Sequence, residues 1–140
     1  MPVDTDLVES VARLALFADL DRDELEVVLP HVDEVSFDEG KWVVRRGDED
    51  VGLHIIVDGE VGVVLEDEEL ATLKKGSFFG EISALLHEPT VADIIARSAV
   101  RCVIVPAANV ERFLLDNPKV MLRMLQTEAR RVRTTDELRI

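Results

Sequence analysis

The spacing of hydrophobic positions changes twice along the chain. Between residues 4 and 30 apolar side chains recur at helical spacing, as at Leu7, Val11 and Leu14. From residue 31 onward, apolar and polar positions follow the two-residue period of strands, and glycines separate the runs. Helical spacing returns after residue 106. The pattern predicts one domain over residues 1–140, with helices at 4–30, a roll of strands at 31–106 and helices at 107–139.

Local signals set several expected boundaries. Asp4 or Thr5 is expected to cap the first helix, whereas Asp21 caps the second and Pro30 stops it. Asp58-Gly59 is a hairpin signal between two apolar runs. Short strands with glycine turns favour a barrel or jelly roll. The strands are expected near residues 32–37, 42–44, 53–57, 61–65, 70–73, 90–96 and 100–106.

The stretch from Phe78 to Ala96 contains the clearest candidate site. Two aromatic residues and a glycine precede a short apolar segment, and Pro89 then leads into a β-branched run. The order strand, glycine, short helix and strand is typical of an anion cradle, because a helix N-terminus presents unpaired N–H groups. Gly80 is expected to let a ligand approach the backbone closely.

Composition narrows the class of protein. No apolar run reaches the roughly 18 residues of a membrane helix, and no signal peptide is apparent, so a cytoplasmic protein is expected. The single cysteine, Cys102, excludes a disulfide framework within this chain and is expected to be a buried hydrophobe.

Charge is unevenly distributed between the two halves. Residues 1–70 hold 21 acidic against 5 basic residues, and residues 71–140 hold 8 against 11. An acidic half repels phosphate backbones, so no direct contact with nucleic acid is expected. The acids are expected to solvate one face; an acidic high-salt proteome and a basic partner are the alternatives.

The stretch 78–96 resembles the phosphate-binding cassette of cyclic nucleotide-binding domains, as in the catabolite activator protein and the regulatory subunits of cyclic-AMP-dependent kinase. Those cassettes read roughly F-G-E-[LI]-[AS]-L-L, followed by P-R-A-A-[TS]-V. The resemblance covers about residues 16–115. Its matching positions are Phe79, Gly80, Glu81, Ile82, Ser83, Pro89 and Ala92 in the cassette, and Phe37, Gly40, Val43, Gly47, Asp48, Ile56, Gly59, Val61 and Val63 before it.

The resemblance implies an α+β fold, an eight-stranded antiparallel β-roll or jelly-roll barrel with helices at both ends and a short cassette helix. It also implies a regulatory domain rather than an enzyme. Glu81 would accept a hydrogen bond from the ribose 2′-hydroxyl of cyclic AMP or cyclic GMP. Backbone N–H groups near Glu81, Ile82 and Val91 would meet the phosphate. The implied ligand-binding set is Phe79, Gly80, Glu81, Ile82, Ser83, Thr90, Val91 and Asp93.

Two positions depart from the family pattern. The arginine that pairs with the cyclic phosphate falls on Thr90, and the family Ser/Thr falls on Asp93. A missing guanidinium removes a charge-assisted contact, and a carboxylate nearby repels a phosphate. We therefore expect the cassette to be degenerate and the binding of a cyclic nucleotide, or of another small ligand, to be impaired or altered. His87 and Arg97 are the candidates for a substitute cation.

The same residues also leave other classes of function open. A domain of this fold without ligand, serving interaction or dimerisation, is the main alternative. A cupin-like enzyme or metal protein would need converging histidines and carboxylates, but His31, His54 and His87 are far apart and form no motif. No catalytic residue, metal site or cofactor is therefore expected. A haem sensor using Cys102 or a histidine is a further alternative.

The predicted last helix carries a stripe of apolar residues that could pair two copies of the chain. Asn117-Pro118 predicts its start. Leu122, Leu125, Ala129 and Val132 then follow heptad spacing until Asp136. Such a stripe serves either a homodimer or packing on the chain's own barrel, and the homodimer is expected. Transcription factors of the family continue into a helix-turn-helix domain beyond this point, so the chain is either a free-standing sensor module or part of a longer one.

Overall fold

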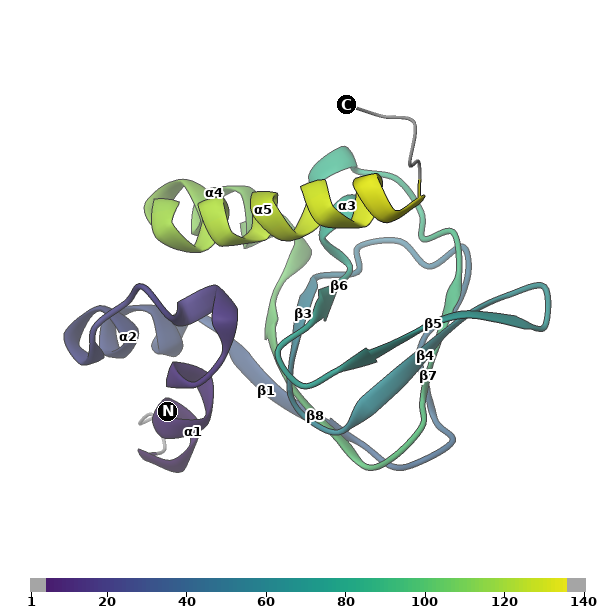
Figure 1. The fold of residues 1–140 in the computed structure, drawn as a ribbon, viewed down its shortest axis with the longest axis horizontal. Helices are drawn as coiled ribbons and strands as arrows, with labels where there is room; N and C mark the ends of the chain where they lie inside the picture. Colours follow the sequence, from purple (N-terminus) through teal and green to yellow (C-terminus); the bar gives the residue numbers. More distant parts are fainter. Residues whose placement is uncertain (1–4, 136–140) are drawn as a thin grey trace.

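Two four-stranded antiparallel sheets form a roll in the computed structural model, which describes residues 5–135 (Figure 1). The α+β fold with eight antiparallel strands, expected from the family resemblance, is confirmed. One sheet has the order β1 (Asp33–Phe37), β8 (Val100–Val105), β3 (Leu53–Asp58) and β6 (Phe78–Phe79). The other has the order β2 (Trp42–Val44), β7 (Asp93–Ala96), β4 (Glu60–Leu65) and β5 (Glu68–Lys74).

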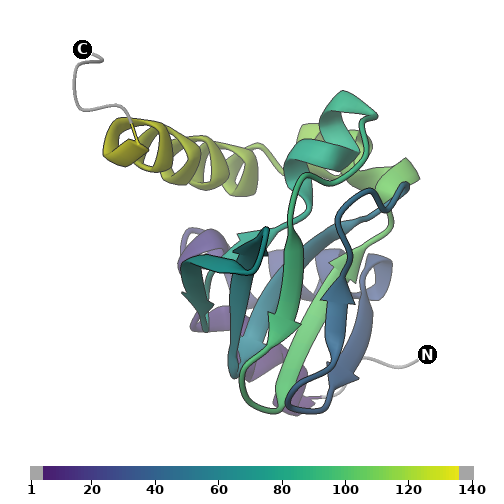
Figure 2. The ribbon, with the colours of Figure 1, turned by 90° about the vertical axis from the view of Figure 1, so that its right-hand side faces the viewer.

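Helices lie on one face and at one end of the roll. α1 and α2 flank the sheet that contains β1 and β8, whereas α3, α4 and α5 lie together at one end (Figures 1 and 2). None of the helices in this described part of the chain is long and apolar enough to cross a membrane. Their bounds are α1 (Thr5–Ala12), α2 (Arg22–Val28), α3 (Glu81–Leu86), α4 (Val110–Asp116) and α5 (Pro118–Thr135), with 3₁₀ turns at Ala15–Phe17, Leu29–His31 and Ala107–Asn109.

The cap predicted for the second helix is confirmed. The Asp21 carboxylate accepts the N–H of Glu24 at 2.8 Å, and the Glu24 side chain accepts the N–H of Asp21 at 3.2 Å, which forms a capping box. Pro30 lies in the 3₁₀ turn that follows α2. For the first helix, the candidate cap Asp4 lies outside the described residues, and the other candidate, Thr5, is the first residue of α1. The predicted end of the last helix at residue 139 also lies outside the described residues.

The hairpin predicted at Asp58-Gly59 is wrong. β3 pairs with β6 and β8 in one sheet, and β4 pairs with β5 and β7 in the other, so this turn carries the chain between sheets. Gly59 has the positive φ of 87° that the signal implied, and a Cβ there would collide with the carbonyl oxygen of Ala99. The signal identified the turn correctly but did not determine which strands pair.

The hydrophobic core has two parts, one on each side of the first sheet. The larger lies between that sheet and the helices, where it buries Phe17 and Ile55, and the smaller lies inside the roll, where it buries Ile56 and Cys102. β3 is buried from Leu53 to Val57 without alternation, because both faces of the strand are covered. Burial raises the pKa of Cys102 to about 12, so its thiol stays protonated, as expected for a small hydrophobe.

Candidate functional site

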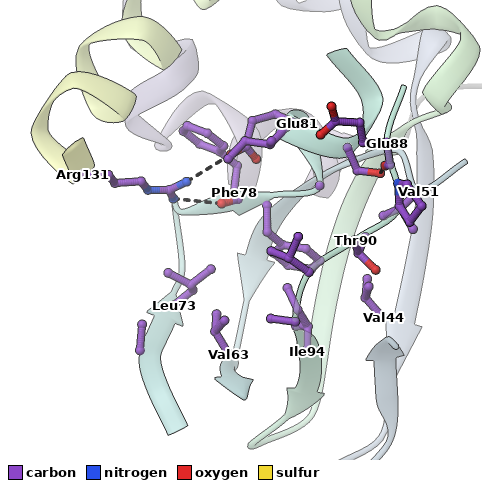
Figure 3. A pocket seen from close by; sticks show the side chains of 18 residues that line it. Val44, Val51, Val63, Leu73, Phe78, Glu81, Glu88, Thr90, Ile94 and Arg131 are labelled. Carbon is purple, nitrogen blue, oxygen red and sulfur yellow. Dashed lines mark hydrogen bonds and ion pairs between the residues drawn. The ribbon is translucent and has the colours of Figure 1, made fainter. Parts of the chain in front are cut away.

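A cavity of about 370 Å³ opens between the second sheet and the stretch 78–94, and the C-terminal part of α5 reaches its edge (Figure 3). Its walls are mainly aliphatic and aromatic, as is usual for small-molecule sites. Its polar lining comes from Glu81, Ser83, Glu88, Thr90 and Arg131. The apolar walls include Val44, Val51, Val63, Leu73, Phe78, Phe79 and Ile94.

The structure brings all but one of the predicted ligand-binding residues to this cavity. Asp93 is absent from the lining, because its Oδ1 accepts the backbone N–H of Arg46 at 2.7 Å. Its carboxylate is therefore held by the loop after β2. The predicted residues that do line the cavity are Phe79, Gly80, Glu81, Ile82, Ser83, Thr90 and Val91.

Gly80 turns the chain from β6 into the predicted short helix. Its φ is 88°, and a Cβ there would collide with the carbonyl oxygen of Gly52. The close approach that requires this glycine is thus made by the chain's own backbone. The neighbouring loop also fixes His54, whose Nδ1 lies 2.9 Å from the same Gly52 oxygen and whose ring stacks on Phe79.

Glu81, the first residue of α3, has an almost fully buried carboxyl group. Only 4% of the residue is exposed, and Oε2 has no hydrogen-bond partner within the described structure. Burial, reinforced by the nearby Glu128 carboxylate, raises the pKa of Glu81 to about 7, while the Arg131 guanidinium opposes the rise. Near neutral pH this group can therefore either accept or donate a hydrogen bond.

Arg131 is a basic residue of the cavity lining that sequence reasoning missed. Its Nη2 donates to the Phe78 carbonyl at 2.9 Å and to Ser77 Oγ at 3.0 Å. Its Nη1 lies 3.0 Å from Glu128 and 3.4 Å from Glu81, and the guanidinium covers the Phe78 ring (Figure 3). In the sequence, the three-residue spacing of Glu128 and Arg131 indicates an ion pair on one face of a helix. It does not indicate that this pair lies at the cavity.

Thr90 is fixed to the loop after β2. Its Oγ1 donates to the Arg45 carbonyl at 2.8 Å, its N–H donates to Asp48, and its carbonyl accepts from Gly47. These bonds explain why the strand predicted for residues 90–96 begins only at Asp93. The Thr90 hydroxyl is thus already donating within the protein.

The candidate substitute cations lie away from the cavity lining. Arg97 bonds Glu69 at 2.8 Å, and His87 ends α3 in a left-handed conformation at the exposed surface. Of the two arginines beside Thr90, Arg45 covers the Trp42 ring and Arg46 lies 3.6 Å from Glu66. Among the described residues that line the cavity, the basic side chain is Arg131.

Metal chemistry has no candidate ligand set in the described part of the chain, where no group of three or more His, Cys, Asp or Glu side chains converges.

Comparison with known proteins identifies the type of domain. Residues 34–117 match the family model described as the cyclic nucleotide-binding domain. Over 94 residues the chain is 36% identical to a cGMP-dependent protein kinase of Plasmodium berghei, and this covers 67% of the chain and 11% of the kinase. Over 93 residues it is 29% identical to the cAMP-dependent protein kinase type II regulatory subunit of Drosophila melanogaster, which covers 66% of the chain and 25% of that protein. The match thus spans only a minor part of either relative.

Solved structures agree on the fold. The crystal structure of the Thermus thermophilus catabolite activator protein superimposes with a TM-score of 0.76 at 24% identity, over 87% of this chain and 60% of that one. At this level of identity the likeness concerns the fold alone.

Proposed function

Because this chain belongs to the cyclic nucleotide-binding domain family, we propose that it is a regulatory domain in which recognition of the cyclic phosphate is impaired. The ligand site is the cavity next to α5. A cytoplasmic location, expected from the sequence, remains part of this proposal. The domain type is itself non-catalytic, and any activity of a larger protein would belong to other segments.

The observation that carries this proposal is the state of Thr90. By resemblance it occupies the position of the family arginine, yet it is neutral and its hydroxyl donates to the Arg45 carbonyl. The guanidinium in the described lining, that of Arg131, is bonded to Glu81, Glu128, Ser77 and Phe78. In Figure 3 it lies on the other side of Phe78 from Thr90. A cyclic phosphate beside Thr90 would therefore lack a paired cation.

The missing ion pair at position 90 is expected to weaken the binding of a cyclic nucleotide strongly. Removing one partner of a buried charge pair costs about 2–5 kcal/mol. Since each 1.4 kcal/mol is about tenfold in affinity, the expected weakening is roughly 30-fold to a few thousand-fold.

Restoring the guanidinium tests the proposal. Thr90→Arg should raise the affinity for cyclic AMP or cyclic GMP at least about 30-fold in isothermal titration. Thr90→Gln is the matched control, because it lengthens the side chain without adding charge and should leave the affinity near that of the wild type. Equal affinities for all three proteins would contradict the proposed role of Thr90.

A second candidate function, an interaction or dimerisation module without ligand, is favoured by the outer face of α5. Leu122, Leu125 and Val132 are 54%, 62% and 44% exposed, whereas Val120 and Met124 are buried against the rest of the fold. The heptad stripe noted in the sequence thus faces away from the chain's own roll. This exposure supports a homodimer through α5 as part of the proposal.

A further inference from the structure

One oxygen of a buried carboxyl group in the cavity has no hydrogen-bond partner among the described residues. Glu81 lines the cavity, is 4% exposed, and leaves Oε2 without a hydrogen-bond partner in the described structure. Buried side-chain polar atoms are rarely left unpaired in native proteins. The orphaned oxygen therefore points to a hydroxyl or amine donor that arrives with a ligand.

The ionic groups of the lining disfavour an anionic ligand. Two acidic residues, Glu81 and Glu88, and one basic residue, Arg131, are among the described residues that line the cavity. This guanidinium already lies within 3.4 Å of Glu81 and 3.0 Å of Glu128. A buried negative charge is stable only when it is paired, so a phosphate entering here would bear an uncompensated desolvation cost.

The same groups suit an uncharged molecule with adjacent hydroxyls. A carboxylate has two oxygens and can accept from both hydroxyls of a cis-diol. A ribonucleoside carries free 2′- and 3′-hydroxyls, whereas in a 3′,5′-cyclic nucleotide the 3′-oxygen is esterified and a negative charge is added. The apolar walls at Val63, Leu73 and Ile94 provide a surface for a heteroaromatic base.

We propose that this cavity binds an uncharged ribonucleoside in preference to the corresponding cyclic nucleotide. The inference rests on the proposed function in one respect, namely that this cavity is the ligand site of the domain. Glu81 holds the diol, the apolar walls hold the base, and Thr90 closes the region that a phosphate would occupy. Arg131 stays bonded to the Phe78 carbonyl beside the diol.

The test is a set of calorimetric titrations of the wild-type protein with adenosine, 2′-deoxyadenosine and cyclic AMP, repeated with guanosine, 2′-deoxyguanosine and cyclic GMP. One ribonucleoside should bind at least about tenfold more tightly than its cyclic monophosphate and its 2′-deoxy analogue, the effect of one hydrogen bond to a charged group. Glu81→Gln should weaken nucleoside binding about tenfold by the same reasoning. Glu88→Gln, the matched control, removes the other acid of the lining and should leave nucleoside affinity within about twofold. Circular dichroism confirms that each variant is folded.

The outcomes separate this inference from the proposed function. Cyclic nucleotide binding as tight as, or tighter than, nucleoside binding overturns the inference and leaves the cavity as a ligand site. If wild-type protein binds none of the compounds but Thr90→Arg binds a cyclic nucleotide, the inference fails and the proposed role of Thr90 stands. If neither protein binds any compound, both proposals fail.

Discussion

Arg131 Nη1 lies 3.4 Å from Glu81 Oε1, although 50 residues separate them in the chain. The same guanidinium donates to the carbonyl of Phe78, in the strand that leads into the cassette. The last helix is therefore attached to the cavity by hydrogen bonds from one charged side chain. A ligand hydroxyl that bonds Glu81 would compete with the contact between Arg131 and Glu81, whereas the bond from Arg131 to the Phe78 carbonyl is expected to remain.

Removal of this attachment should destabilise the fold. Arg131→Ala leaves the buried Glu81 carboxyl without its cation, and the free energy of unfolding should fall by about 1–3 kcal/mol. Arg133→Ala is the control, since Arg133 is exposed on the same helix and should change stability by less than about 0.5 kcal/mol. Urea denaturation of the three proteins makes the comparison, and equal effects of the two substitutions would show that the attachment does not stabilise the fold.

Stability should decrease as pH rises through the range set by Glu81. Its pKa is raised from 4.5 to about 7 by folding, so the folded state retains a proton that the unfolded state loses first. The stability that the neutral Glu81 carboxyl contributes is fully present below pH 4.5 and is lost as pH rises through about 7. The difference of about 2.5 pKa units sets the maximum loss at roughly 3–4 kcal/mol, at 1.36 kcal/mol per pKa unit.

Glu81→Gln isolates this pH effect, because the amide does not titrate. Urea denaturation at pH 5 and pH 8 should show that the variant gains stability relative to the wild type at the higher pH. Other titrating groups, such as the buried His54, whose pKa is lowered by burial, are present in both proteins. Their contributions to the pH dependence of stability therefore cancel when the variant is compared with the wild type. A difference that does not change with pH would contradict the assigned shift.

Substitutions at two glycines with nearly equal φ allow the cost of a left-handed backbone to be measured separately from the cost of a steric collision. Gly40 and Gly80 have φ of 85° and 88°, but a Cβ on Gly40 meets nothing within 4 Å, whereas one on Gly80 collides with the Gly52 carbonyl. Gly40→Ala should cost about 1 kcal/mol of unfolding free energy, the cost of a left-handed residue. Gly80→Ala should cost at least about 1–3 kcal/mol more, because the backbone must move. Similar costs in urea denaturation would contradict the packing described at Gly80.

The exposed stripe on α5 predicts a homodimer. Leu125→Asp should convert the dimer to a monomer in sedimentation velocity, because it places charge at the centre of the apolar face. Val27→Asp is the control, since Val27 is 70% exposed on α2, on another part of the surface. A monomeric wild-type protein would contradict this prediction.

The elements predicted correctly are those with local causes. Asp21 caps α2 through a residue three positions away, and the apolar run Trp42–Val44 forms β2 as expected. The Asp58-Gly59 signal failed because turn chemistry fixes φ but not the sheet that the next strand joins. The hairpin between β4 and β5 turns instead at Glu66 and Asp67, both at positive φ without a glycine to mark them.

The site was predictable only where one continuous stretch supplies it. Residues 79–83 and 88–91 of the cassette line the cavity because they follow one another through β6, the start of α3 and the next loop. Arg131 could not be found this way, since its contacts depend on how α5 packs over the cassette. The orientation of Asp93 towards the Arg46 N–H is likewise a tertiary contact, made across 47 positions.

The central claim is that this domain retains its ligand cavity but has lost effective recognition of a cyclic phosphate. Isothermal titration of the wild-type protein with cyclic AMP and with cyclic GMP, each to millimolar concentration, tests it most directly. We predict no saturable binding in the micromolar range for either compound. Micromolar binding of either would contradict the claim and would show that the cavity holds a cyclic phosphate without an arginine at position 90.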